Sequence, residues 1–279
     1  MNRGDRRERI FVDDADRQRF VDTLGEACAK TGWQVHAYVL MPNHFHWVVE
    51  TPQSNLVAGM KWLLGTYTSR FNRRHKLFGH LFSGRYKSLI VDGSSSGYLK
   101  SVGNYVHLNP ARAKLVVADA PLKSFAWSSW PAYLLAPSKR PAWLRVDRLL
   151  GAWGIPEDSP AGRQRLEQAL EERRSAEEGE EFKPIRRGWC LGEEKFREEL
   201  LKQMSARMGS ETTMTVGWIA ERLAMGTRGY LNHRLYRQRK LGGEYPISRT
   251  DPFFMSRRWR NGAARRKARS SSRFGVVGV

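Results

Sequence analysis

The chain contains only two cysteines, Cys28 and Cys190, and it has no long hydrophobic run. Two cysteines provide neither the disulfide framework of a small secreted domain nor a cysteine metal site. No stretch of about 18 consecutive apolar residues occurs, which is the length that a membrane-spanning helix needs. The N-terminus, MNRGDRRERI, is highly charged, unlike the apolar centre of a secretory signal. We therefore expect a cytoplasmic protein in a reducing compartment, neither secreted nor embedded in a membrane.

Acidic residues are scarce relative to basic ones. The chain has 28 Asp and Glu against 48 Lys and Arg, a formal net charge of +20 and a sequence pI near 10.4. An excess of this size predicts a polyanionic partner. Nucleic acid is the first candidate, and a ribosomal or membrane-surface role is the rival. The ten tryptophans count against a purely disordered basic protein, because such chains are poor in aromatic residues.

The scarcity of acid is greatest between Glu50 and Asp119, where Asp92 is the sole acidic residue against ten Lys and Arg. Aromatic residues are interleaved with these cations. Binding of single-stranded nucleic acid requires both features, cations for the phosphates and aromatic faces for the unstacked bases. A solvated charged face, the alternative, would normally mix both signs. The candidate DNA contacts in this stretch are Arg73, Arg74, Arg85, Lys87 and Arg112.

Hydrophobic periodicity and turn residues predict an α+β fold. The expected elements are a helix at 14–30, strands at 33–41 and 44–50, a helix at 56–71, a strand at 81–91, and a helix from 98 that stops at Asn109-Pro110. Asp13 or Asp14 can cap the first helix, and Gly32 can end it. This order is the pattern of a ferredoxin-like sheet, but such a sheet also needs a strand before its first helix. The sequence has only about a dozen charged residues there, so the first strand is expected to be absent.

The rest of the chain is expected to be mostly helical. The expected divisions are 1–135 for the first domain, 136–210 for a connector with mixed-charge helices, 211–250 for a helix-turn-helix segment, and 251–279 for a disordered basic tail. In the helix-turn-helix segment, Arg228, Asn232 and Arg234 would lie on the second helix, where they suit a major groove or phosphates. A plain helical hairpin with a solvated basic face explains the same pattern.

Two histidines, His44 and His46, begin the second expected strand. Side chains two residues apart on a strand point to the same face, so both imidazoles can reach one divalent metal. Tyr105 and Asn109 are four residues apart and share one helix face. If that face lies against the histidine strand, Asn109 can be a third ligand and Tyr105 a nucleophile toward a phosphodiester. The alternatives are exposed strand histidines and a core tyrosine, and spacing alone does not decide between them.

Five stretches together resemble the single-tyrosine HUH transposases, and within them the REP-associated tyrosine transposase branch. They are NRGDRRERIF, AYVLMPNHFHWVVETP, FNRRHKLFGHLFSGRYKSLIVD, YVHLNPARAKLV and WSSWPAY, which run from about Asn2 to Tyr133 in family order. The resemblance implies a bacterial enzyme that cleaves single-stranded DNA beside imperfect hairpins with Mg²⁺ or Mn²⁺. It implies Tyr105 as the catalytic tyrosine, which leaves a 5′-phosphotyrosine, and His44, His46 and Asn109 as the metal ligands. The DNA-bound protein would be associated with the nucleoid, as a monomer or a homodimer.

The chain departs from this family pattern in two places. The apolar strand that normally precedes Asn2-Arg3-Gly4 is missing, which a misassigned start codon, decay of the gene or a strand from a partner would explain. Asn104 stands where the family often has a basic residue. A domesticated or decayed DNA-hairpin-binding protein without catalysis is therefore the alternative function. A rolling-circle initiator or relaxase is a third reading, disfavoured because no G-x-x-x-x-G-K-[ST] phosphate loop is visible.

Overall fold

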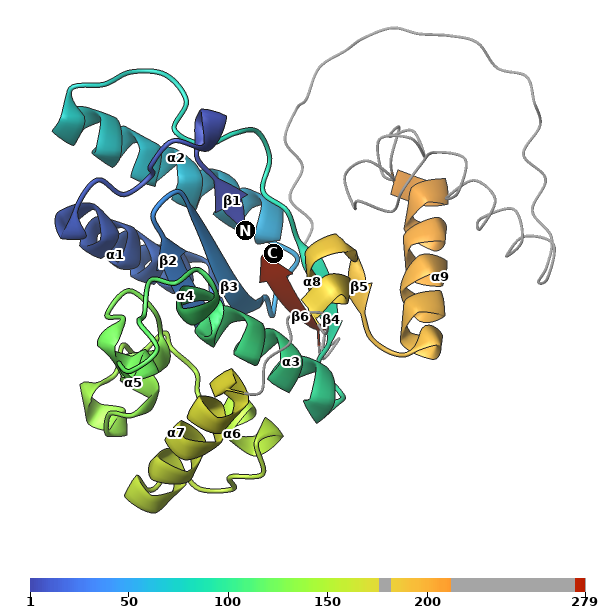
Figure 1. The fold of residues 1–279 in the computed structure, drawn as a ribbon. Helices are drawn as coiled ribbons and strands as arrows, with labels where there is room; N and C mark the ends of the chain where they lie inside the picture. The colour runs from blue at the N-terminus through green and yellow to red at the C-terminus, as the bar shows by residue number, and fades with distance from the viewer. Residues whose placement is uncertain (176–181, 212–273, 279) are drawn as a thin grey trace, which may run out of the picture.

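A computed structural model describes residues 1–175, 182–211 and 274–278 (Figure 1). It is a mixed helix and sheet structure, so the expected α+β class is confirmed. The strands are β1 (Asn2–Arg3), β2 (Gln34–Met41), β3 (His44–Glu50), β4 (Leu89–Asp92), β5 (Cys190–Leu191) and β6 (Phe274–Gly278). The helices are α1 (Asp14–Thr31), α2 (Leu56–His75), α3 (Ser96–His107), α4 (Asn109–Arg112), α5 (Trp130–Tyr133), α6 (Asp147–Ala152), α7 (Pro160–Ser175), α8 (Lys183–Arg187) and α9 (Glu194–Glu211), with short 3-10 turns η1 (Asp5–Arg7), η2 (Leu122–Ser124) and η3 (Pro137–Lys139).

The first helix begins and ends at the residues expected from the sequence. The Asp13 carboxylate accepts a hydrogen bond from the Asp16 backbone N–H at 3.0 Å, which satisfies one of the free N–H groups of the first turn. The helix ends at Gly32, whose φ of +72° lies in the left-handed region that glycine adopts without strain.

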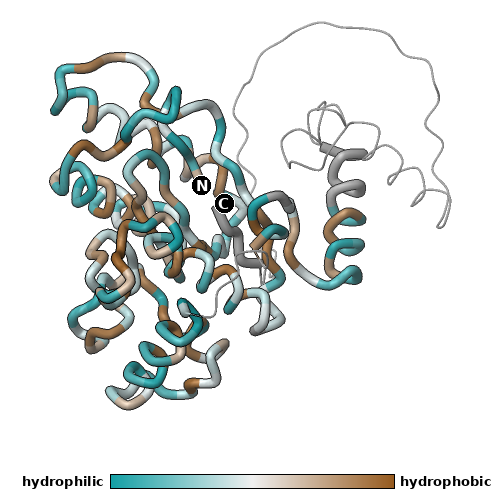
Figure 2. The backbone as a smooth tube through the Cα atoms, in the orientation of Figure 1, coloured by the Kyte–Doolittle hydropathy of each residue, from teal (hydrophilic) through white to brown (hydrophobic). Residues whose placement is uncertain are grey.

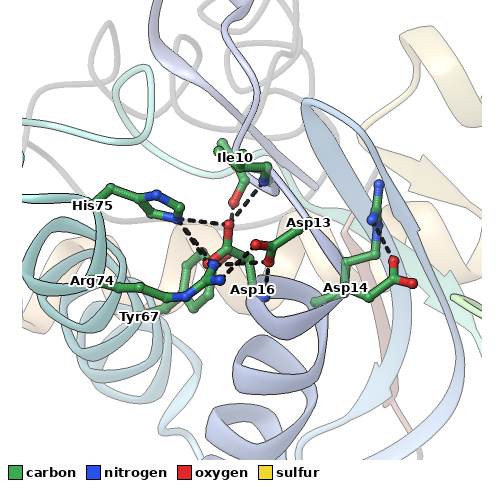
Figure 3. A network of polar contacts seen from close by, with 9 residues as sticks. Ile10, Asp13, Asp14, Asp16, Tyr67, Arg74 and His75 are labelled. Atoms are coloured by element: carbon green, nitrogen blue, oxygen red, sulfur yellow. Dashed lines mark hydrogen bonds and ion pairs between the residues drawn. The ribbon is translucent and has the colours of Figure 1, made fainter.

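A network of polar contacts fixes α1 against the end of α2 (Figure 3). Asp16 is fully buried, and its carboxylate accepts from the Val12 N–H at 2.9 Å and from Arg74 at 2.6 Å. Arg74 also binds Asp13, and His75 Nε2 lies 2.9 Å from Asp16. A buried carboxylate is tolerated only with such partners. Arg74 therefore connects the two helices in this structure.

The β2–β3 hairpin separates two faces of the sheet. Phe45 points toward α1, with its ring centroid 4.8 Å from that of Phe20. His44 and His46 point to the opposite face, where His46 meets Tyr105 of α3 at a ring distance of 5.3 Å. Figure 2 shows hydrophobic residues running through the centre of the molecule, with hydrophilic residues alternating along the outer helices. The hairpin thus presents its histidines to α3 and anchors itself on the other face by Phe45 and Trp47, both almost fully buried.

The gap beside β3 is filled from both ends of the chain. Asn2 and Arg3 of β1 pair with Phe45 and His44, and β6 continues the same line by pairing antiparallel with Trp47–Glu50 of β3 and with Leu89–Asp92 of β4. The chain termini therefore lie side by side (Figure 1). This corrects the expectation that the first strand is simply absent. It also places a strand in the 251–279 segment, which was expected to be disordered.

The strand expected at 81–91 is shorter, because β4 covers only Leu89–Asp92. Residues before it pair with the N-terminal segment instead. The Ser83 N–H donates to the Arg3 carbonyl at 2.8 Å, and the Asp5 N–H donates to the Leu81 carbonyl at 3.0 Å. Gly84 then takes a φ of +63°, which interrupts regular strand geometry. Arg85 and Lys87 consequently lie in an irregular segment beside β1 and not within a strand.

The tryptophan-rich connector lies along the outer edge of β2. Leu40 donates to the Trp127 carbonyl at 2.8 Å, and the Ser129 N–H donates to the Tyr38 carbonyl at 2.9 Å. Of the expected helix-turn-helix at 211–250, nearly all lies outside the described residues, including Arg228, Asn232 and Arg234. In the part of the chain that is described, no helix has the length and apolar character needed to cross a membrane.

Candidate active site

His44 and His46 form the floor of the candidate site. Their rings lie 4.9 Å apart and nearly perpendicular at 86°. His44 Nδ1 is 2.6 Å from the Asn43 side-chain oxygen, while the Asn43 amide nitrogen donates to the Arg7 carbonyl at 3.0 Å. The second bond fixes the orientation of the amide, so Nδ1 of His44 must be the protonated nitrogen. Nε2 of His44 is therefore left with a lone pair, as in metal-ligating histidines whose other nitrogen is held by a neighbour.

Tyr105 and Asn109 come to this floor from the helix side. Tyr105 lies in the last part of α3, and Asn109 begins α4 after a single residue, Leu108, with helical φ and ψ angles. The interruption at Leu108 leaves the four-residue spacing on one face. Tyr105 is 6% exposed and Asn109 is 9% exposed. Both line the same pocket as the two histidines, a cavity of about 390 Å³. The helix face and strand face that the sequence analysis treated as a condition do meet in the structure.

Positive charge surrounds the pocket. Its lining includes Arg3, Lys87, Arg112 and Arg186, and it includes no carboxylate. Burial is the main cause that lowers the pKa of His44, to about 4, and nearby positive charges act in the same direction. Burial likewise holds the pKa of His46 well below its usual value. Both imidazoles are therefore neutral at neutral pH, which is the state that binds metals.

Arg112 holds Tyr105 between two groups. Its guanidinium carbon lies 4.3 Å from the centre of the Tyr105 ring and 4.5 Å from that of Phe182, and it donates to the Tyr105 backbone carbonyl. Such stacking of a cation on aromatic faces fixes the ring orientation. Burial raises the pKa of Tyr105, while the charges of Arg112, Arg186 and Arg3 oppose this rise. Stacking and charge thus favour a tyrosine that is held in place and biased toward its anion.

The donor set fits a divalent metal that binds together with an anion. Among the described residues, no group of three or more His, Cys, Asp or Glu is placed to hold a metal. The available donors are two neutral imidazoles and the Asn109 amide oxygen. His46 Nδ1 is a buried nitrogen with no hydrogen-bond partner within the described part of the chain. Neutral donors leave the metal's charge uncompensated, so an oxygen of a phosphate would complete its surroundings.

Other histidines in the chain have structural partners. His107 Nε2 lies 2.9 Å from the Ser129 hydroxyl, with its ring against Trp130 and Tyr133, and burial lowers its pKa to about 3. His36 contacts Glu50 at 3.2 Å. Each of these rings is engaged in holding packed segments together, which leaves His44 and His46 as the pair facing an open pocket.

The residues expected to contact DNA occupy different environments. Lys87 and Arg112 line the pocket described above, and Arg85 lines a second pocket that adjoins it. Arg73 is exposed on α2, whereas the neighbouring Arg74 is bound to Asp13 and Asp16. As DNA contacts, all five remain predictions.

The sequence analysis did not single out Arg3 or Arg186. Arg3 is brought to His44 by the pairing of β1 with β3. It lies within the NRGD run, so its position directly before the glycine was a usable signal. Arg186 comes from α8, more than 70 residues beyond Asn109, and nothing in its sequence surroundings marks it for the pocket.

The fold and pocket define a class of protein. A tyrosine, two neutral imidazoles and an amide converge in a cation-lined pocket at one face of an α+β sheet, as expected of an enzyme that acts on phosphodiesters. Residues 1–109 match the family model of IS200-like transposases, a span that ends at Asn109 and contains all four residues. No curated protein and no solved structure gave a significant match. The family match supports a transposase, hence an enzyme with DNA as its partner.

Proposed function

We propose that this protein is a metal-dependent single-strand DNA endonuclease and strand transferase of the REP-associated tyrosine transposase type. The observation that carries the proposal is the convergence of Tyr105, His44, His46 and Asn109 in one pocket lined by cations and by no carboxylate. Its substrate would be single-stranded DNA beside hairpin-containing repeats, the class that the family resemblance implies. Residues 1–135 would be the catalytic unit, with a ferredoxin-like HUH arrangement of strands.

Tyr105 acts as the nucleophile in this proposal. A bond forms between its phenolic oxygen and the scissile phosphorus, and the bond from that phosphorus to the 3′-oxygen breaks. The phenol loses one proton and the departing 3′-oxygen gains one, so no co-reactant is needed. The DNA is left as a 5′-phosphotyrosine with a free 3′-hydroxyl. Reverse attack by a 3′-hydroxyl rejoins the strand and frees Tyr105, so no water-activating base is required.

His44, His46 and Asn109 would hold Mg²⁺ or Mn²⁺. When bound, the metal supplies polarisation of the phosphodiester and neutralises charge in the transition state. Arg3, Arg112 and Arg186 attract the same phosphate, and their charges favour the tyrosine anion against the effect of burial. The absence of a lining carboxylate fits an anionic substrate, because an acid at this position would repel the phosphate.

The mechanism predicts a covalent adduct that depends on one oxygen atom. The full chain is incubated with a labelled hairpin oligonucleotide and Mn²⁺, and protein-bound label is measured on a denaturing gel. Wild type should form the adduct, and Tyr105→Phe should lose it completely, since phenylalanine keeps the ring between Arg112 and Phe182 but has no nucleophile. Unchanged thermal unfolding of Tyr105→Phe serves as the control. An adduct that persists in this variant would refute the assignment of Tyr105.

A non-catalytic DNA-hairpin-binding protein is the second candidate function. The low exposure of Tyr105, 6%, and its position between Arg112 and Phe182 favour this alternative, because an attacking oxygen must reach the phosphorus. The same experiment separates the two. Salt-sensitive binding of the hairpin without any adduct, at every metal concentration, would establish binding without cleavage.

A further inference from the structure

Two consecutive arginines after β1 have an uncommon backbone conformation. Arg6 has a φ of +49° and Arg7 a φ of +64°, both in the left-handed region that residues other than glycine rarely adopt. Strain of this kind persists only where surrounding contacts hold it, and it is concentrated at functional sites. We call residues Gly4–Arg7 the arginine turn.

The arginine turn is held rigidly from three sides. The Gly4 N–H donates to the Asn43 carbonyl at 2.9 Å, and the Asp5 N–H donates to the Leu81 carbonyl at 3.0 Å. Gly4 is closely approached, since a Cβ added there would lie 2.1 Å from the Glu8 carbonyl oxygen. The Asn43 side chain links the Arg7 carbonyl to His44 Nδ1. The turn is thus connected through one amide to the histidine floor of the candidate active site.

A second pocket, of about 290 Å³, lies against the arginine turn. The basic side chains that line it are Arg3, Arg6, Arg7, Arg85 and Lys87, and no acidic residue does so. Arg3 and Lys87 also line the active-site pocket, so the two cavities adjoin. Like charges gathered this closely repel one another, which makes the cluster costly unless an anion occupies it.

The cations of the turn differ from the other arginines of the fold. Arg70, Arg74 and Arg145 are each bound to carboxylates. For Arg3, Arg6 and Arg7, the described residues provide no ion pair. Arg3 Nε is moreover a buried nitrogen without a hydrogen-bond partner in this part of the structure. Buried donors normally have partners, so this nitrogen indicates a missing acceptor.

We propose that this second pocket binds the phosphates of the DNA strand that flank the phosphate in the active site. The proposal rests on the proposed function, since it takes the strand at the active site as given. Guanidinium groups match phosphate oxygens in pairs. A strand crossing from one pocket to the other passes Arg3 and Lys87, which face both. The rigid turn and the Asn43 link hold the flanking phosphates at a fixed position relative to His44.

The test measures binding without cleavage. A labelled oligothymidylate is titrated against the full chain in EDTA at several salt concentrations. The variant Arg6→Asn/Arg7→Asn removes both charges, while asparagine still accepts the left-handed backbone. With about 0.7 in slope lost for each phosphate contact, the slope of log K against log salt should fall by about 1.4, with weaker binding throughout. Arg85→Gln, on the facing segment, should lower the slope by about 0.7.

The matched control removes the same charge elsewhere. Lys139→Gln/Arg165→Gln changes two exposed cations that line neither pocket, and it should leave the slope unchanged. An unchanged slope in Arg6→Asn/Arg7→Asn, or an equal fall in the control, would overturn the proposed phosphate site. Tyr105→Phe should bind like wild type. Loss of the adduct reaction therefore bears on the proposed function, whereas the salt slope bears on the phosphate site alone.

Discussion

At the scale of single residues, the fold depends on polar side chains that are buried with designated partners. Glu50 ends β3 and lies between His36 at 3.2 Å and Arg148 at 2.9 Å. Arg148 belongs to α6 and also donates to the Gly93 carbonyl at 2.5 Å. One carboxylate thereby connects two strands, a helix and the turn after β4. The His36 and Arg148 contacts lower the pKa of Glu50 to about 2.

This lowered pKa predicts acid sensitivity. The pKa of Glu50 in the folded protein lies below its ordinary value of 4.5, so its stabilising effect is present above that value and is lost as the pH falls toward 2. At neutral pH, Glu50→Gln should lower the free energy of unfolding by up to about 3 kcal/mol. The difference from wild type should shrink below about pH 4. Urea unfolding at several pH values measures this.

The exposed Glu172 on α7 provides the control for Glu50. Glu172→Gln should unfold like wild type at every pH, because an exposed carboxylate gains little from folding. A Glu50→Gln deficit that stays constant down to the lowest pH would show that size or shape, and not charge, explains the loss.

At the scale of elements, α2 carries neighbouring arginines in opposite situations. Arg74 joins α2 to α1 through Asp13 and Asp16, whereas Arg73 is exposed. The sequence placed both among the DNA contacts because both lie in an acid-free stretch. The acids that bind Arg74 precede that stretch by more than 35 residues, so local charge counting could not find them.

Substituting the two arginines separately should give different results. Arg74→Gln should lower the Tm by several degrees, because buried Asp16 loses its guanidinium partner. Arg73→Gln should leave the Tm unchanged and reduce the salt slope of single-strand binding by about 0.7. Thermal unfolding and anisotropy titrations on the same samples compare them. Equal Tm values for both variants would contradict the connecting role of Arg74.

Much of the site was predictable because it depends on local geometry. Strand alternation places His44 and His46 on one face, and helical spacing places Tyr105 and Asn109 on another. What the sequence does not contain is the pairing of distant segments. The shortening of the strand expected at 81–91 follows from hydrogen bonds to Arg3 and Asp5, and the stacking of Phe182 on Arg112 joins residues 70 positions apart. Neither has a periodicity that could be read from composition.

At the scale of the whole molecule, β6 connects the two halves of the sheet. It pairs with β3 on one side and β4 on the other, so its removal would leave backbone groups of both strands without partners. The histidine strand β3 is one of them. The geometry of His44 and His46 therefore depends on residues near the end of the chain.

A proline within β6 tests this dependence. Val276 is aligned with Val49 of β3 and Ile90 of β4. Val276→Pro removes one N–H from the ladder and should lower the free energy of unfolding by about 1–3 kcal/mol, the cost of a backbone group left without its partner. Val279→Pro, one position beyond the strand, is the control. Identical urea midpoints for the two variants would show that β6 does not support the sheet.

The place of β6 also sets an order of events during synthesis. The chain from β1 to β4 is complete at Asp92, but the strand that lies between β3 and β4 begins only at Phe274, 274 − 92 = 182 residues later. Contacts so distant in sequence form slowly, and a sheet with an open centre can pair with other chains in the meantime. A ribosome that stops anywhere between these points releases a product with an unclosed sheet beneath its histidines. Closure of the sheet would thus make the catalytic pocket a property of the finished chain.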